Sequence, residues 1–283
     1  ITTVSRKYAQ EIQTSEYGFG LEGVLRARAG SLSGILNGVD YSEWSPAKDK
    51  HIVRQYSPEN LEGKKECKYD LLRQFGMESV SIDLPVIGIV SRFAAQKGFD
   101  LISEIAHDLA RLPLVLTALG SGDKEYQDLF LQLNKQFPGK IAVKVAYDNA
   151  LAHKIEAGAD MFLMPSRYEP SGLNQMYSLK YGTVPIVRST GGLDDTIEPW
   201  DAATGKGAGF KFSAYSGVAL LNCIHEALRA FKDQAAWSKL MLNGMSKDFS
   251  WTASAREYVK IYERLVPPKA SGAQEKVLEF SRA

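Results

Sequence analysis

An arginine and a lysine follow the first long apolar run of the sequence and could bind a phosphorylated ligand. Residues 85–90 are uninterruptedly apolar, and Arg92 and Lys97 come after them in the stretch SRFAAQKG. The planar fork of an arginine can hold two phosphate oxygens, whereas a lysine supplies a compact positive charge. The pair therefore indicates a diphosphate clamp, although two solvated surface charges would leave the same pattern.

A glutamate and a glycine follow a later apolar run, residues 161–164, and could contact a sugar. Glu169, Ser171 and Gly172 lie in the stretch PSRYEPSG, before a segment with helical periodicity. We predict that Ser171 is the N-cap, and that Gly172 lets a ligand approach the free backbone N–H groups of the helix start. Glu169 would accept hydrogen bonds from sugar hydroxyls in this cleft. The alternative is that it only offsets the helix dipole.

A third loop carries paired glycines after the apolar run 184–187. Thr190, Gly191 and Gly192 precede a short predicted helix. Successive backbone N–H groups in such a turn form a second anion-binding site, although glycine pairs also occur in ordinary turns. All three loops follow predicted strands, and ligands of parallel sheets bind at the carboxyl ends of strands. We therefore expect the three loops to share one site.

The apolar pattern of the sequence supplies the strands that would hold these loops together. Short apolar runs, typical of strands buried on both faces, alternate with segments of helical periodicity. Such repeats predict an α/β fold, a Rossmann-like doubly wound parallel sheet with right-handed crossovers. A proline in the last predicted strand suits a strand end or a sheet edge. The predicted strands are residues 85–90, 114–119, 141–146, 161–164 and 184–187.

Beyond Gly209 we expect only helices. One apolar stripe is formed by Val218, Leu221, Ile224, Leu228 and Phe231, at helical spacing. Two further helices are predicted at residues 237–245 and 253–265, and the polar residues after them are expected to form a flexible tail.

The composition excludes several classes of protein. The chain has 283 residues, 45% of them hydrophobic and 24% charged, as in ordinary globular proteins. Its net charge of +1 gives no electrostatic reason to expect nucleic acid or an anionic membrane as partner. No apolar run approaches the ~20 residues that span a bilayer, and two cysteines cannot build a disulfide framework.

Metal and dinucleotide sites are not expected. The four histidines, at positions 51, 107, 153 and 225, are scattered and not clustered with cysteine. Gly18, Gly20 and Gly23 match the dinucleotide-binding spacing but follow a helix-like segment rather than a strand. An oxidoreductase is therefore the least favoured class of enzyme.

The loops and their surroundings strongly resemble the bacterial glycogen synthases and plant starch synthases. The resemblance spans nearly all of residues 1–265 and implies a retaining glucosyltransferase that uses ADP-glucose. The stretches that carry it are ILNGVDYSEWSP (35–46), GIVSRFAAQKGFDLI (88–102), PSRYEPSGLNQMYSLKYGTVPIVRSTGGLDDTI (165–197) and DFSW (248–251).

The resemblance implies the GT-B fold, in which two Rossmann-type domains face each other across a cleft. The chain opens in mid-element at Ile1, as expected for the later part of a longer protein that lacks the N-terminal acceptor domain. Residues 1–34 then correspond to the end of that domain and a linker, and residues 35–250 to the nucleotide-sugar-binding domain. A C-terminal helix at 251–266 and a tail at 267–283 complete the expected organisation.

The resemblance also assigns roles to individual residues. Arg92 and Lys97 match the cations that bind the diphosphate of ADP, and Glu169 matches the acidic residue of the sugar site; these three are the expected catalytic residues. Tyr177 lies where some other retaining GT-B families carry a second glutamate. The residues expected to bind ADP-glucose are Tyr147, which would stack on the adenine, and Gly172, Leu173, Asn174, Thr190, Gly191 and Gly192.

The implied reaction transfers glucose to the 4-hydroxyl of an α-1,4-glucan with retention of configuration. The resemblance implies neither cofactor nor metal, and places the protein in a bacterial cytoplasm or a plastid stroma. Two alternatives stay open from the residues alone. One is a transferase that uses another nucleotide sugar such as UDP-glucose, and the other is a non-catalytic nucleotide- or carbohydrate-binding module.

Overall fold

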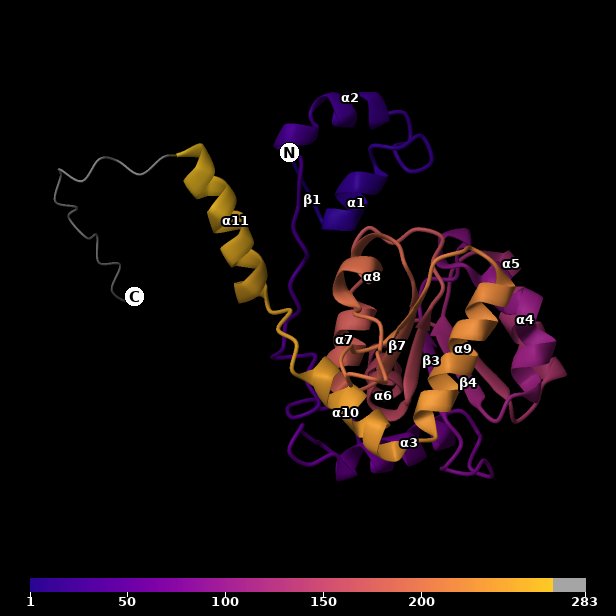
Figure 1. Cartoon of the computed structure of the whole chain (residues 1–283). Coiled ribbons are helices and arrows are strands. Elements are labelled where there is room, and N and C mark those ends of the chain that lie inside the picture. The colour runs from indigo at the N-terminus through magenta and orange to yellow at the C-terminus, as the bar shows by residue number, and fades with distance from the viewer. Residues whose placement is uncertain (267–283) are drawn as a thin grey trace.

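A six-stranded, fully parallel sheet forms the centre of the protein (Figure 1). The computed structural model describes residues 1–266. The strand order is β5-β4-β3-β6-β7-β8, so the chain builds one half of the sheet, returns to the middle and then builds the other half. This confirms the predicted doubly wound α/β sheet. The strands are β3 (Val86–Val90), β4 (Val115–Gly120), β5 (Ile141–Val145), β6 (Met161–Met164), β7 (Val184–Arg188) and β8 (Phe210–Phe212).

Helices cover both faces of the sheet, which explains why its central strands are apolar throughout. On one face Ile87 and Ile89 share a core with residues of α4, α5 and α9, and on the other Val86 and Val115 pack against α3 and α6. Figure 1 shows these two layers on opposite sides of the strands. The covering helices are α3 (Glu62–Gln74), α4 (Phe99–Arg111), α5 (Lys124–Gln136), α6 (Asn149–Gly158), α7 (Asn174–Tyr181), α9 (Gly217–Phe231) and α10 (Gln234–Met245).

Two features of the second half of the sheet differ from the prediction. The sheet has a sixth strand, β8, in the region beyond Gly209 that was expected to be purely helical. Strand β7 therefore lies inside the sheet rather than at its edge. Pro185 has no N–H to donate, but none is needed at its position. The N–H of Val184 donates to Asp160 beside β6, so the nitrogen of Pro185 faces the β8 side. The pairing with β8 begins only at Ile186, one residue later.

The apolar stripe predicted for α9 is partly wrong. Val218 is 71% exposed, whereas Ile224 and Leu228 lie in the core together with Leu220 and Cys223. The helices predicted at 237–245 and 253–265 are present as α10 and α11 (Trp251–Leu265), and each begins a few residues earlier than expected. Helix α3 was not predicted, and the expected tail lies outside the described residues.

The first 34 residues pack onto the sheet domain from above, beside the carboxyl ends of its strands (Figure 1). Strand β1 (Thr2–Thr3) pairs in parallel with β2 (Ser33–Gly34), and between them lie α1 (Arg6–Glu11), α2 (Glu22–Ala27) and the 3₁₀ turn η1 (Ala29–Ser31). Helix α1 contacts α8 (Gly191–Thr196), and α11 projects away from the sheet. In residues 1–266, no helix is both long enough and apolar enough to cross a bilayer.

Candidate active site

A cavity of about 380 Å³ opens where the sheet reverses its strand order, at the carboxyl ends of β3 and β6. Such a reversal leaves a crevice between neighbouring loops, and ligands of doubly wound sheets bind there. The cavity brings together loops that lie about seventy residues apart in the sequence. The predicted site residues that line it are Arg92, Lys97, Glu169, Gly172, Leu173 and Asn174.

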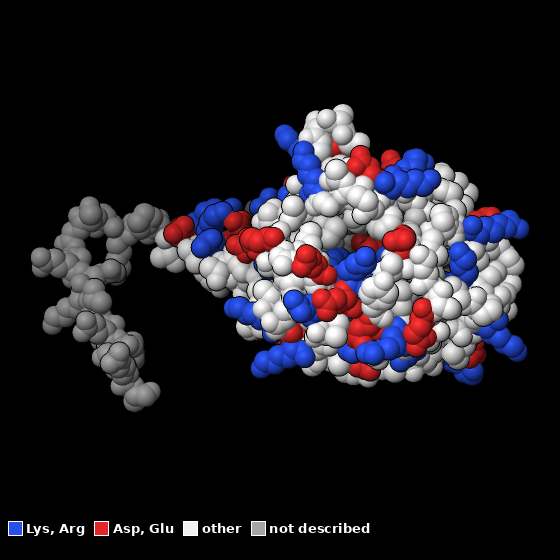
Figure 2. Space-filling model, turned by 90° about the horizontal axis from the view of Figure 1, so that it is seen from below, with Lys and Arg blue, Asp and Glu red and all other residues white. Residues whose placement is uncertain are grey.

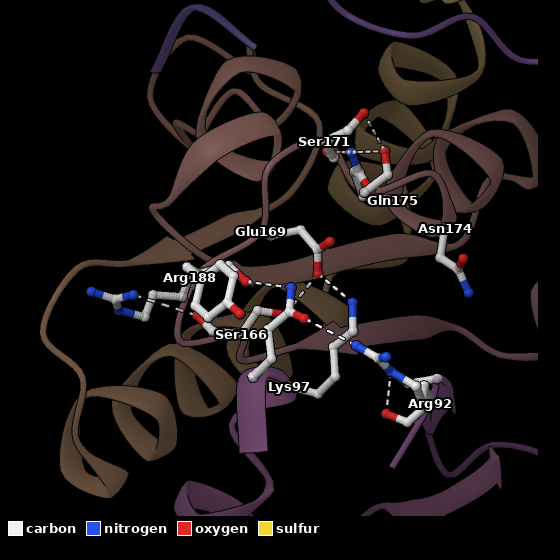
Figure 3. Close-up of polar contacts among 12 residues, drawn as sticks. Arg92, Lys97, Ser166, Glu169, Ser171, Asn174, Gln175 and Arg188 are labelled. Atoms are coloured by element: carbon white, nitrogen blue, oxygen red, sulfur yellow. Dashed lines mark hydrogen bonds and ion pairs between the residues drawn. The ribbon is translucent and has the colours of Figure 1, made fainter. Parts of the chain in front are cut away.

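Lys97 and Glu169 form an ion pair inside this cavity. The lysine Nζ lies 2.6 Å from Glu169 Oε2, and the two side chains are 19% and 8% exposed. Ser166 Oγ donates a second hydrogen bond of 3.1 Å to the same carboxylate oxygen, as Figure 3 shows. Glu169 thus points into the cavity, as predicted, and is held there by partners from two loops rather than by a helix dipole.

Gly98 brings the lysine loop (residues 91–98, with Lys97) close to the glutamate loop (residues 165–172, with Glu169). Lys97 ends the short 3₁₀ turn η2 (Ala95–Lys97), and Gly98 turns the chain into α4 with a φ of 73°. A Cβ atom on Gly98 would lie only 2.1 Å from the carbonyl oxygen of Pro165. Only glycine combines this left-handed backbone with so close an approach, so Gly98 fixes the separation of the two loops.

Arg92 lies beside Lys97, and within residues 1–266 its guanidinium makes one hydrogen bond. One Nη2–H donates to Gln96 Oε1 at 3.2 Å, and Gln96 in turn donates to the carbonyl oxygen of Tyr168 at 3.1 Å. The arginine is exposed, so the rest of its guanidinium fork is accessible to a ligand (Figure 3). Two adjacent cations from one loop therefore border the cavity, which favours the clamp over unrelated surface charges.

A second arginine, which the sequence did not indicate, supports the glutamate loop from behind. Arg188 ends β7 and donates through Nη1 to the carbonyl oxygens of Arg167, at 2.5 Å, and Ser166, at 3.4 Å. In Figure 3 its guanidinium points away from Lys97 and Arg92. Its contribution is to hold the backbone of the glutamate loop, and its position at a strand end is the signal that could have found it.

Helix α7 begins at the cavity without a side-chain cap. The N-cap is Leu173, not Ser171, and the leucine side chain has no oxygen that could accept from the first-turn N–H groups. The prediction for Ser171 was wrong because Gly172 adopts a φ of 68° and adds a further turn before the helix. Asn174 Nδ2 donates to the carbonyl oxygen of Val90 at 3.1 Å and fixes the helix start to β3. An uncapped helix start beside two cations suits an anion.

The glycine pair lies behind the cavity rather than in its wall. Thr190 and both glycines are buried, and the backbone N–H of Gly192 donates to the carbonyl oxygen of Glu169 at 3.0 Å. A Cβ on Gly191 would come within 1.9 Å of that same oxygen, and a Cβ on Gly192 within 1.9 Å of the Ser171 oxygen. The two glycines therefore let this loop press against the backbone of Glu169 and its neighbours.

Tyr147 lies apart from the cavity. It follows β5, the strand at the sheet edge, and is 91% exposed. Its ring is free to receive a flat partner, and its role with a base stays a prediction.

A buried polar cluster that the sequence did not indicate lies between α6, α7 and the segment before α3. His153 Nδ1 and Tyr181 Oη lie 2.8 Å and 2.6 Å from Asp49 Oδ2. Burial alone would raise the pKa of Asp49, but the hydrogen bonds from His153 and Tyr181 lower it. The Trp44 ring stacks on His153 at 3.8 Å and on Tyr177 at 4.0 Å.

A buried acid and a buried lysine lie behind α7, and burial shifts the pKa of both. Glu156 accepts a 2.7 Å hydrogen bond from Ser178, and burial raises its pKa to about 8. Lys64 donates to Thr183 Oγ1 at 2.7 Å and to the carbonyl oxygen of Ala157, and burial lowers its pKa to about 8. Neither lines the cavity, so both belong to the packing of the helices behind it.

The face seen in Figure 2 carries no single-sign patch of charge, and the described residues form no metal centre. Lys and Arg side chains are interspersed with Asp and Glu across the face seen from below (Figure 2). Between residues 1 and 266, no three His, Cys, Asp or Glu side chains are grouped closely enough to hold a metal ion.

Comparisons with known proteins assign both parts of the chain. The family described as "Glycosyl transferases group 1" matches residues 78–239, and the "Starch synthase catalytic domain" matches residues 1–27. The first match covers the cavity and all six strands of the sheet, β3 to β8.

Curated relatives match almost the whole chain. A glycogen synthase of Koribacter versatilis is 64% identical over 264 residues, which are 93% of this chain and 54% of the relative. A glycogen synthase of Desulforudis audaxviator is 50% identical over 93% of this chain and 52% of its own length. The chain therefore spans about half the length of these relatives.

Among solved structures, the catalytic domain of starch synthase IV from Arabidopsis thaliana, bound to ADP and acarbose, superposes with a TM-score of 0.87. It is 36% identical, and the match covers 93% of this chain and 55% of that domain. The fold around the cavity is thus shared with a structure that contains ADP.

Proposed function

Because this chain belongs to the group 1 glycosyl transferases, we propose that its cavity binds ADP-glucose and that glucose is transferred from there to an α-1,4-glucan. One observation carries the proposal: Arg92, Lys97 and Glu169 line a single cavity at the strand-order reversal, beside the uncapped start of α7. The similarity to glycogen synthases over 93% of the chain supports this donor and this acceptor.

The chemistry follows from the charges that border the cavity. Breaking the bond between glucose and phosphate leaves negative charge on the departing diphosphate. Arg92 and Lys97, together with the first N–H groups of α7, stabilise that charge as it develops. Fixed donors that favour the transition state over the bound substrate are what accelerate such a step. Retention of the anomeric configuration is proposed from the same similarity.

Glu169 acts on the sugar side of the same cavity. Its carboxylate accepts hydrogen bonds from glucose hydroxyls, while the adjacent Lys97 ammonium lies between the sugar and the diphosphate. Tyr147 is the proposed platform for the adenine, and Thr190, Gly191 and Gly192 support the loop beside the phosphate and the glucose. The similar starch synthase structure is bound to ADP, which supports a nucleotide ligand for this fold.

No metal or cofactor is needed in this proposal. Arg92, Lys97 and the first N–H groups of α7 can bind a diphosphate directly, and the carboxylate of Glu169 is already paired with Lys97. Glucosyl transfer should therefore persist unchanged in the presence of EDTA.

The partners of the whole protein follow from its relatives. We propose that an N-terminal acceptor domain, as in the longer glycogen synthases, forms the other wall of the cleft and binds glucan. We further propose a bacterial cytoplasmic location, because the curated relatives are bacterial; a plastid stroma is the alternative if the source is a plant.

Calorimetric titration of the 283-residue chain with ADP tests the nucleotide site. ADP should bind, UDP should compete only weakly, and Arg92→Ala should weaken ADP binding about tenfold, because a charge-assisted bond contributes roughly 1.5–3 kcal/mol. The chain alone should transfer little glucose. Stronger competition by UDP than by ADP would favour a UDP-glucose transferase, and no nucleotide binding would favour a non-catalytic module.

A further inference from the structure

Helices α1 and α8 lie side by side and cap each other's starts. Glu11, at the end of α1, accepts hydrogen bonds from Thr190 Oγ1 and from the backbone N–H of Gly191 at the start of α8. Asp195, near the end of α8, accepts hydrogen bonds from Ser5 Oγ and the first N–H groups of α1. Two carboxylates thus join α1 and α8, which lie about 180 residues apart in the sequence; this contact is called the α1–α8 joint below. Only Glu11 bonds to the glycine loop behind the cavity.

Glu11 is the partner on the cavity side. The residue is only 9% exposed, and its two oxygens lie 3.1 Å and 3.2 Å from the Gly191 nitrogen. Both also lie 3.2 Å from Thr190 Oγ1. The carboxylate therefore fixes Thr190 and Gly191, the first two residues of the glycine loop.

A short chain of contacts connects Glu11 to the cavity. The N–H of Gly191 bonds to Glu11, and the N–H of the next residue, Gly192, donates to the carbonyl oxygen of Glu169. The Glu169 side chain receives Lys97 at 2.6 Å. Between Glu11 and Glu169 there is no room for even one methyl group on Gly191. A shift of the glycine loop must therefore move Glu169 or break its backbone hydrogen bond.

We propose that Glu11 is a positioning residue for glucosyl transfer: it presses the Thr190–Gly192 loop against the backbone of Glu169 and so keeps Glu169 and Lys97 in register. This inference rests on the proposed function of the cavity. Asp195 acts on the other side of the same joint. It accepts hydrogen bonds from Ser5, Arg6 and Lys7 at the start of α1, and none of these residues lines the cavity.

Folding stability alone gives no reason for an acid at position 11. Burial raises the pKa of Glu11, against the opposing effects of its hydrogen bonds to Gly191 and Thr190 and of the charges on Lys7 and Arg188. The folded state therefore favours the protonated form. As the pH rises from the ordinary glutamate pKa of 4.5 toward the raised pKa of Glu11, the unfolded chain loses its proton more readily than the folded protein. The free energy of unfolding therefore falls over this pH range. An uncharged residue of the same shape would avoid this cost.

The experiment compares the two sides of the joint. This chain would replace the matching 264 residues of the Koribacter versatilis glycogen synthase, and Glu11→Ala, Glu11→Gln and Asp195→Ala would be measured in that chimera. The readouts are kcat, the KM for glycogen and the Tm. Both alanine variants should lower the Tm. Only Glu11→Ala should lower kcat, by about tenfold, at an unchanged KM for glycogen.

Glu11→Gln retains one acceptor oxygen and should restore part of kcat without lowering the Tm. Equal losses of kcat in Glu11→Ala and Asp195→Ala would show that the joint is only structural and would overturn the proposal, as would full kcat in Glu11→Ala. If Glu11→Ala fails to fold, unchanged kcat in Glu11→Gln overturns it as well. If the chimera without substitutions is inactive, that result contradicts the proposed function, and the inference about Glu11 fails with it.

Discussion

Replacing Lys97 by methionine removes one charge from the cavity at nearly constant volume. The ammonium lies 2.6 Å from Glu169, and the two side chains are 19% and 8% exposed, so the pair is largely shielded from water. In the free protein, Lys97→Met leaves Glu169 with Ser166 as its remaining side-chain donor. Losing a partner of a buried charged group costs roughly 1–3 kcal/mol of stability.

The effect on catalysis should be larger than the effect on stability. Two unit charges about 4 Å apart interact by about 4 kcal/mol at an effective dielectric constant of about 20. If that interaction forms fully with the departing diphosphate, its loss lowers kcat about 1000-fold, since each 1.4 kcal/mol is roughly a factor of ten. Because Lys97 lies on the donor side of the cavity, the affinity for glucan should change little.

Steady-state kinetics of the chimera with ADP-glucose and glycogen measures both quantities. Lys97→Met should lower kcat by two to three powers of ten, about 3–4 kcal/mol, while the KM for glycogen stays within about twofold. Lys124→Met is the matched control, because that lysine is 86% exposed and pairs with Asp128, outside the cavity. Comparable losses of kcat and of glycogen binding in Lys97→Met, or a loss no larger than in the control, would refute the leaving-group role.

Three further perturbations test other parts of the site. Tyr147→Ala should weaken ADP binding about tenfold in calorimetry, because stacking of a base on an aromatic ring contributes roughly 1–3 kcal/mol; unchanged affinity would place the adenine elsewhere. Gly191→Ala should lower both the Tm and kcat, since its Cβ would meet the Glu169 oxygen at 1.9 Å, and normal values of both would contradict the close contact. Glu156→Gln should raise the free energy of unfolding at pH 7 by about 1–3 kcal/mol. The folded state holds a proton on Glu156 up to a pKa of about 8 and the unfolded state only to 4.5, so stability of the parent falls as the pH rises between these values. Urea titrations from pH 5 to pH 8 should show this slope in the parent and not in the variant.

The sheet could be predicted from the sequence because its strands are buried on both faces. β3, β4 and β6 are short apolar runs bounded by helical segments, and this pattern has few other solutions. β8 was not predicted because it has only three residues with a lysine at its centre, and because it forms by pairing with β7. Local sequence does not encode such a partner.

The cavity residues were predictable because they follow strands whose carboxyl ends meet at one edge. Arg92 and Glu169 come from loops after β3 and β6, the two strands at the point of reversal, so topology alone brings them together. The Ser171 cap was not predictable in this way, because the left-handed turn at Gly172 delays the helix.

Contacts between residues far apart in the chain could not be predicted from the amino-acid sequence. Glu11 lies on a short helix with nothing in its neighbourhood to indicate the glycine loop, and His153 reaches Asp49 across 104 residues. Both contacts depend on how whole elements pack, a feature that periodicity and spacing do not contain.

A crystal structure of this chain soaked with ADP would show where the diphosphate binds. We expect the diphosphate within about 3 Å of the Arg92 guanidinium, the Lys97 ammonium and the first N–H groups of α7. If ADP binds with its phosphates on any other surface, and this cavity stays empty at saturating ADP, the diphosphate site is not here.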